Sequence, residues 1–133
     1  MDEKKTPLRP PAWRPAIALI LAMGAAGCGP AATPADPDDG RKALVAALDA
    51  WKGGEKPADL AARSPAIHVA DGDWESGFQL QGYTPEGEGK LIGSDLNYTV
   101  ALELKNPRGK VATRKAVYAV STHPQILVLR QDD

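Results

Sequence analysis

The feature that most constrains the fold is an alternation of apolar and polar residues between positions 96 and 105. Successive side chains of a β-strand point to opposite faces of a sheet, so a period of two predicts a strand with one buried face and one wetter face. The residues expected on the buried face are Leu96, Tyr98, Val100, Leu102 and Leu104.

Turn signals on both sides of this strand predict its neighbours. Asn106-Pro107-Arg108-Gly109 fits a type I turn, with Pro second and Gly fourth, and leads into a strand at 110–121. Residues 122–125 predict the next reversal, before an apolar segment at 126–129 that we expect to be central or covered on both faces.

A further turn is expected upstream of the alternating strand. The segment 85–89, Pro-Glu-Gly-Glu-Gly, is predicted to separate a strand at 78–84 from a long strand at 90–105, in which Gly93-Ser94-Asp95 would form a bulge or bend. Three turns would then join four strands in an antiparallel meander.

Helices are expected before these strands. Ala and Leu dominate residues 41–52, where Leu44, Leu48 and Trp51 share one helical face. Asp38 or Asp39 would cap this helix, and Gly53 would end it. A second short helix is predicted at 57–63, with Leu60 pointing inward.

These elements predict a small α+β domain at residues 41–133, in which an N-terminal helix packs on a four-stranded antiparallel meander sheet in two layers. The order of elements resembles the cystatin-like and NTF2-like folds, in which a curved sheet wraps around an N-terminal helix. A domain of this length is near the lower end of what one core sustains without staples.

The first 27 residues have a different composition. The chain has 16 basic and 17 acidic side chains, and four basic and two acidic ones lie within residues 1–27, which leaves 12 and 15 for the remainder. The uncharged apolar run at 16–27 is too short for the roughly 20 residues of a membrane-spanning helix, and it ends in small residues. This pattern is typical of a secretory signal peptide.

The only cysteine of the chain follows directly. Ala25-Ala26-Gly27-Cys28 resembles the lipobox of bacterial lipoproteins, which prefers Leu where this chain has Ala25. The resemblance implies cleavage before Cys28, acylation of its thiol and attachment to a membrane of the cell envelope. Gly29, where Asp would favour inner-membrane retention, implies the outer membrane, facing the periplasm. The alternative is a free thiol beside an uncleaved anchor.

Residues 28–40 are predicted to be a flexible tether between lipid and domain. After the cysteine, the segment has three Pro, three Asp and no large apolar residue, so it cannot bury enough surface to offset the entropy of ordering.

One acidic cluster is a candidate metal site. Asp71, Asp73 and Glu75 stand at alternate positions, like the first ligands of a calcium loop. Ser76 occupies the position of the loop's glycine, and Gly82 that of its bidentate glutamate, so the rest of the calcium motif is missing. The favoured interpretation is a solvated turn.

Zinc is the second metal considered. His68 with Asp71 and Asp73 would offer three donors, whereas His123 stands alone. We favour a surface histidine beside a turn, with Trp74 filling the end of the core. We therefore predict neither a metal nor a cofactor.

No residue set predicts catalysis. The serines lack a Gly-x-Ser-x-Gly elbow, and two histidines supply few bases; the serines considered are Ser64, Ser76, Ser94 and Ser121. The most basic segment is the tip of the hairpin at 105–115, which carries Lys105, Arg108, Lys110, Arg114 and Lys115. It could meet anionic lipid or peptidoglycan, but such charges usually solubilise a turn, and the acidic balance after residue 27 argues against nucleic acid.

Three functions are compatible with the sequence. The favoured one is a non-enzymatic envelope lipoprotein whose domain binds a protein or a cell-wall component, through an exposed apolar patch or a strand edge. The second is a small-molecule carrier or degenerate enzyme of NTF2-like type, with a pocket between helix and sheet. The third is a structural spacer or homodimer, in which the apolar segment at 126–129 and one face of the sheet pair across a symmetry axis.

Overall fold

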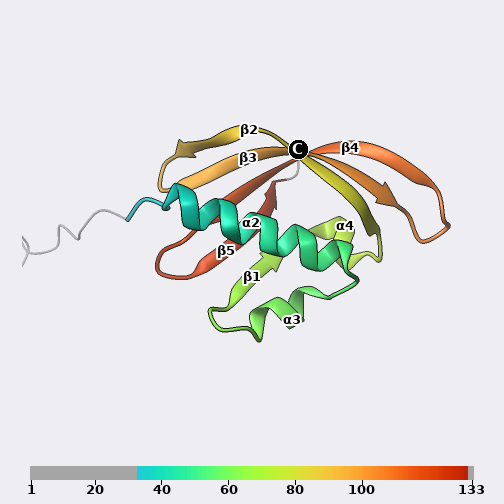
Figure 1. Ribbon diagram of the computed structural model, residues 1–133, viewed down its shortest axis with the longest axis horizontal. Helices are drawn as coiled ribbons and strands as arrows, with labels where there is room; N and C mark the ends of the chain where they lie inside the picture. Colours follow the sequence, from blue (N-terminus) through green and yellow to red (C-terminus); the bar gives the residue numbers. More distant parts are fainter. Residues whose placement is uncertain (1–32, 132–133) are drawn as a thin grey trace, which may run out of the picture. The chain divides into compact units, whose positions relative to one another are not determined.

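The computed structural model describes residues 33–131, which form an α+β domain. Its elements are α2 (Pro37–Lys52), α3 (Pro57–Ala61), β1 (Ile67–Ala70), α4 (Gly72–Glu75), β2 (Gln79–Ile92), β3 (Asp95–Lys105), β4 (Val111–Ser121) and β5 (Ile126–Gln131). The five strands make one sheet in the order β1-β5-β4-β3-β2, and α2 lies across one of its faces (Figure 1).

The sheet is mixed, which differs from the predicted four-stranded antiparallel meander. Strands β2 to β5 pair antiparallel with their neighbours in sequence, as predicted. The additional strand, β1, pairs in parallel with β5, with Ile67 opposite Ile126 and Ala70 opposite Leu129. The four residues of β1 are too few to show a clear period. Its partner β5 comes last in the chain, and two parallel strands that far apart are not joined by a local turn that the sequence could reveal.

The predicted turn at 85–89 is wrong, because this segment lies inside β2. The strand continues to Ile92, and shifts in its pairing with β3 between Leu80 and Gly82 and between Glu86 and Lys90 accommodate the extra residues. β2 is an edge strand, where a proline is tolerated. The chain reverses instead at Gly93-Ser94, where the sequence predicts only a bulge or bend.

Helix α2 begins earlier than predicted. Asp36, rather than Asp38 or Asp39, is its N-cap, and the Asp36 carboxylate accepts hydrogen bonds from the backbone N–H groups of those two residues at 2.9 and 3.0 Å. The helix therefore starts inside the segment predicted to be a tether. The predicted signal peptide, Cys28 and the remainder of the predicted tether through residue 32 lie outside the described residues.

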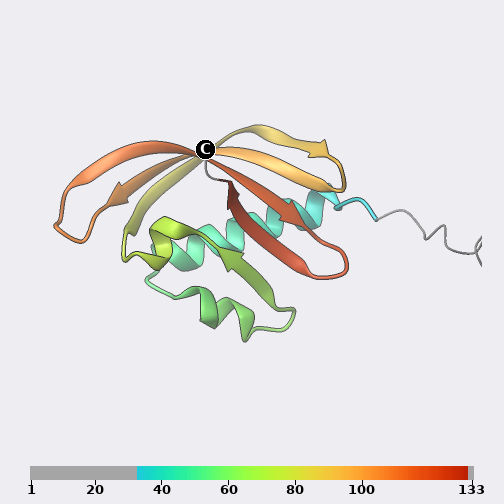
Figure 2. The ribbon, with the colours of Figure 1, turned by 180° about the vertical axis from the view of Figure 1, so that it is seen from behind.

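The core lies between α2 and the sheet. All five residues predicted for the buried face of the alternating strand are buried, and so are the three predicted for the helix and Leu60 on α3. Val128 on β5 is fully buried, and β5 is central in the sheet as predicted. Figure 2 shows β5 from the other side, with α2 behind it. Leu127 and Leu129, which alternate with Val128, are only partly covered.

Gly89 lets β2 pass close to the core. A Cβ atom at this position would lie 2.6 Å from Cζ and 2.7 Å from Cε1 of the Tyr98 ring, which is buried. Rings of this kind cannot yield without displacing the residues packed behind them.

We predict that Gly89→Ala lowers the free energy of unfolding by about 1–3 kcal/mol, because the added methyl group overpacks the Tyr98 ring. Urea unfolding followed by tryptophan fluorescence would measure it. Gly72→Ala is the matched control, since nothing lies within 4 Å of the place that a Cβ atom would occupy there. Equal stability of the two variants would contradict the close packing at Gly89.

Candidate functional site

The candidate acidic cluster lies at α4, a four-residue helix that directly follows β1. Asp71 is the N-cap of this helix, and its carboxylate accepts from the N–H groups of Asp73 at 3.0 Å and Trp74 at 3.3 Å. Glu75 accepts in return from the backbone N–H of Asp71 at 3.1 Å. The acidic spacing seen in the sequence therefore serves a helix cap.

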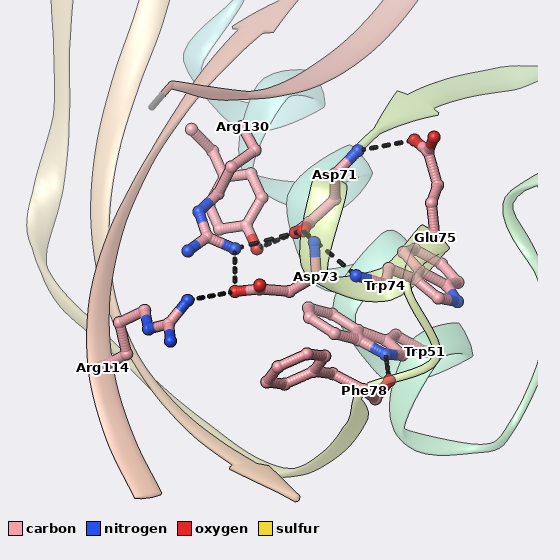
Figure 3. Close-up of polar contacts among 9 residues, drawn as sticks. Trp51, Asp71, Asp73, Trp74, Glu75, Phe78, Arg114 and Arg130 are labelled. Carbon is pink, nitrogen blue, oxygen red and sulfur yellow. Dashed lines mark hydrogen bonds and ion pairs between the residues drawn. The ribbon is translucent and has the colours of Figure 1, made fainter. Parts of the chain in front are cut away.

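Asp71 is buried, with 2% of its surface exposed, so the predicted solvated turn is wrong. The Tyr118 hydroxyl on β4 donates to Oδ2 of Asp71 at 2.5 Å, and the Arg130 guanidinium on β5 donates to Oδ1 at 3.1 Å. Together with the two backbone bonds, the carboxylate accepts four hydrogen bonds and joins α4 to two strands of the sheet (Figure 3).

The charges around Asp71 alternate in sign. Arg130 also contacts Asp73 at 3.0 Å, and Arg114 on β4 reaches the same Asp73 oxygen at 2.9 Å. In the Asp71–Arg130–Asp73–Arg114 network, the side chains of Asp71 and Arg130 are buried, with 1% and 8% of their surface exposed. Arg114, at the other end of the network, is exposed to solvent.

The network shifts the titration of two groups that contact Asp71. Burial raises the pKa of the Tyr118 hydroxyl above its usual range, and the adjacent Asp71 carboxylate raises it further. Burial by itself would lower the pKa of Arg130, but the carboxylates, first Asp71 and then Asp73, outweigh it and raise that pKa. Both groups are therefore held in their protonated forms.

Trp74 fills the end of the core, as predicted. Its ring stacks on Trp51 of α2 at a centroid distance of 5.3 Å and an interplanar angle of 7°. Its indole N–H donates to the Glu55 carbonyl at 2.9 Å, and the Trp51 indole donates to the Phe78 carbonyl at 2.8 Å. Apolar packing and satisfied indoles thus close the site beneath the charged network (Figure 3).

The residues considered as metal ligands do not form a ligand set. His68 is exposed on β1, and Glu75 is exposed at the end of α4. The Asp71 and Asp73 carboxylates lie close together, because both contact Arg130, but each is thereby paired with arginine. Among residues 33–131, no group of three or more His, Cys, Asp or Glu side chains is placed to hold a metal ion. The other histidine, His123, is exposed in the β4–β5 turn.

Two of the basic residues of the β3–β4 hairpin, Arg114 and Lys115, lie on opposite faces of the sheet. Arg114 pairs with Asp73, whereas Lys115 pairs with Glu86 of β2 at 3.4 Å. Consecutive residues of a strand point to opposite faces, so these two charges cannot belong to one surface patch. Arg114 also lies over the Phe78 ring, with its Cζ 5.9 Å from the ring centroid.

Sequence reasoning missed three partners of the aspartates, which are Tyr118, Arg114 and Arg130. They lie 41 to 59 residues beyond the aspartates that they contact. One local signal was present: Arg130 ends an apolar run, at a position that alternates with the buried Val128.

Comparisons with family models, with curated proteins and with solved structures gave no match for this chain. Within residues 33–131, no helix is long and apolar enough to cross a membrane.

We predict that Asp71→Ala lowers the free energy of unfolding by about 3–5 kcal/mol, because it leaves Arg130 and the Tyr118 hydroxyl buried without their main acceptor. Urea unfolding would measure the loss. Glu103→Ala, an exposed acidic residue of β3, is the matched control and should change stability by less than about 0.5 kcal/mol. Similar losses in both variants would show that Asp71 does not hold the site together.

The raised pKa values of the three tyrosines predict a loss of stability at high pH. Burial, with the hydrogen bond to Asp49, raises the pKa of Tyr83 to about 12, and burial raises the pKa of Tyr98 and Tyr118. In the unfolded chain each ionises near pH 10. The stabilisation is therefore complete below about pH 10 and decreases as the pH rises through the folded pKa values.

Absorbance at 295 nm would test this expectation. The native protein should show little tyrosinate at pH 10.5, whereas the protein in denaturant should be largely ionised, because its tyrosines titrate at about 10. Native tyrosines that titrate together with the denatured ones would contradict the raised pKa values of Tyr83, Tyr98 and Tyr118.

Proposed function

We propose that this chain is a membrane-anchored lipoprotein of the bacterial cell envelope, placed at the outer membrane and facing the periplasm. Its domain is a non-catalytic module that binds another protein or a cell-wall component. The observation that carries the proposal is the position of the sole cysteine, between an apolar run that ends in small residues and a domain whose first helix is capped by Asp36.

The start of the domain supports this arrangement. The described core residues run from Ala35 to Val128. The Ala35 N–H donates to the Ser94 carbonyl at 2.8 Å, and the Asp36 N–H donates to the Thr122 hydroxyl at 3.0 Å. A lipid on Cys28 would thus hold the domain by a defined point, a few residues after the anchor.

The hydrogen bonds and ion pairs of the buried polar residues support a module without catalysis. Catalytic groups need a free lone pair or proton directed at a substrate. The buried acidic residue, Asp71, uses its oxygens in four hydrogen bonds within the domain, and Arg130 is shared between two carboxylates. This network serves to hold α4 against the sheet.

A partner that adds a strand to the sheet is disfavoured. β1 is an edge of only four residues. The other edge, β2, contains Pro85, two shifts of register and the charged residues Glu86, Glu88 and Lys90. Short, bulged and charged edges resist pairing with another chain.

A partner that contacts side chains is favoured instead. On the face of the sheet away from α2, a hollow of about 530 Å³ is lined by both charge signs, by amides and by aliphatic groups. Its lining is Glu86, Glu88, Lys90, Ile92, Asn97, Thr99, Val117 and Gln131. This mixture suits a polar peptide or glycan, which needs hydrogen bonds as well as apolar contact.

A carrier of small molecules is the second candidate. We interpret the α2–meander arrangement as cystatin-like or NTF2-like, with β1 added at its edge. A hollow of about 350 Å³ lies beside α2; its lining is Ala43, Ala46, Pro65, Ile67 and Ile126, together with the polar residues Asp39, Lys42 and Thr122. Its size is at the lower end for ligand sites, and no buried carboxylate lines it, so the binding module is preferred.

The lipoprotein proposal predicts that the chain expressed in a Gram-negative bacterium incorporates radioactive palmitate, and that Cys28→Ala abolishes the label. The mature native protein should lack residues 1–27, and its mass should include the acyl chains. Both would be measured on the purified protein from the membrane fraction.

The far-ultraviolet circular dichroism of Cys28→Ala serves as the control, because residue 28 precedes every described core residue and the domain should fold unchanged. Equal label in both proteins, or an intact Met1 on an unacylated native chain, would overturn the proposal.

A further inference from the structure

Two large aliphatic side chains are exposed at the tip of the β2–β3 hairpin. Leu91 is 54% exposed and Ile92 is 62% exposed, and they are adjacent in the sequence. Neighbouring strand residues point to opposite faces, so the tip is uncovered on both sides. Gly93, with φ of 65°, and Ser94 close the hairpin, which pairs Leu91 with Leu96 and Ile92 with Asp95.

The N-terminal end of the domain is attached to this tip. The hydrogen bond from Ala35 joins it to Ser94, the residue that closes the hairpin. Figure 1 shows the start of α2 beside the β2–β3 hairpin. Ala35 is itself buried, so this point of the chain cannot swing away without breaking a packed contact.

Covalent geometry limits how far the tip can be from a lipid on Cys28. Cys28 and Ala35 are seven positions apart, and a fully extended chain spans at most about 25 Å over that length. β3 runs from the tip to the opposite end of the domain over 11 residues, or about 35 Å. The hairpin tip is therefore within reach of the lipid surface, whereas the opposite end would reach it only if residues 29–34 ran back along the domain.

We infer that the β2–β3 hairpin tip is a membrane contact: Leu91 and Ile92 enter the lipid surface to which Cys28 is anchored. This inference rests on the proposed lipid anchor. Residues 90–95 carry one basic and one acidic side chain, so their net charge is zero and apolar burial, rather than attraction to anionic headgroups, drives the contact. Two aliphatic side chains alone would bind a membrane weakly, and the anchor strengthens this contact because it keeps the lipid at a high local concentration.

The contact also sets an orientation. The opposite end of β3 leads to the turn that carries Arg108 and Lys110, both exposed. With the aliphatic tip in the lipid, this basic turn points away from the membrane. Arg108 and Lys110 would then not contact the lipid headgroups.

The test uses the full chain, purified in its lipidated form and reconstituted in vesicles of phosphatidylethanolamine and phosphatidylglycerol. An environment-sensitive fluorophore is attached through Ile92→Cys. Val111→Cys is the matched control, because Val111 is also aliphatic and 50% exposed but lies at the start of β4, opposite Lys105 and thus at the far end. Spin-labelled lipids report contact by quenching.

We expect a blue-shifted emission and several-fold stronger quenching at position 92 than at position 111. Adding Leu91→Ser to the position-92 protein should reduce the quenching. Equal quenching at both positions, on protein whose mass shows the acyl chains, would overturn the membrane contact and leave the lipoprotein proposal intact. A purified protein without acyl chains would overturn both.

Discussion

The Asp71 carboxylate is the point on which the arrangement of this domain depends. It lies where β1 ends and α4 begins, and it is bonded to side chains from β4 and β5. β1 is short and pairs with the sheet along one edge only. A buried charge is tolerated only when its hydrogen bonds are satisfied. Moving α4 would break the bonds to Asp71, so the network holds α4, and with it the end of β1, against the sheet.

The stacked pair of Trp51 and Trp74 depends on the same constraint. Trp74 is the third residue of α4, and it reaches Trp51 only when the helix is held against the sheet. The charged network and the aromatic pair therefore stabilise the same junction from its polar and its apolar side. A site built in this way is suited to rigidity, since its buried carboxylate and both indoles already have partners inside the domain.

The proposed orientation gives the two ends of the domain different tasks. The end with the start of α2 and the β2–β3 hairpin carries the exposed aliphatic pair Leu91 and Ile92, and in the proposed orientation it would contact the membrane, whereas the basic β3–β4 turn at the other end would point away from it. The hollow on the outer face of the sheet shares Ile92 with the hairpin tip, and in the proposed orientation its other lining residues would be left to a partner.

The sequence by itself determined the α+β class, the four antiparallel strands, the buried stripe of α2 and the inward positions of Leu60 and Trp74, because local periods and turn residues specify which faces are apolar. It misplaced the turn at 85–89, since Pro and Gly are also accommodated by bulges in an edge strand. Only the tertiary structure decided the parallel addition of β1 and the partners of Asp71. These contacts join residues 47 to 59 positions apart, and a buried ion pair leaves no periodic trace in the residues around it.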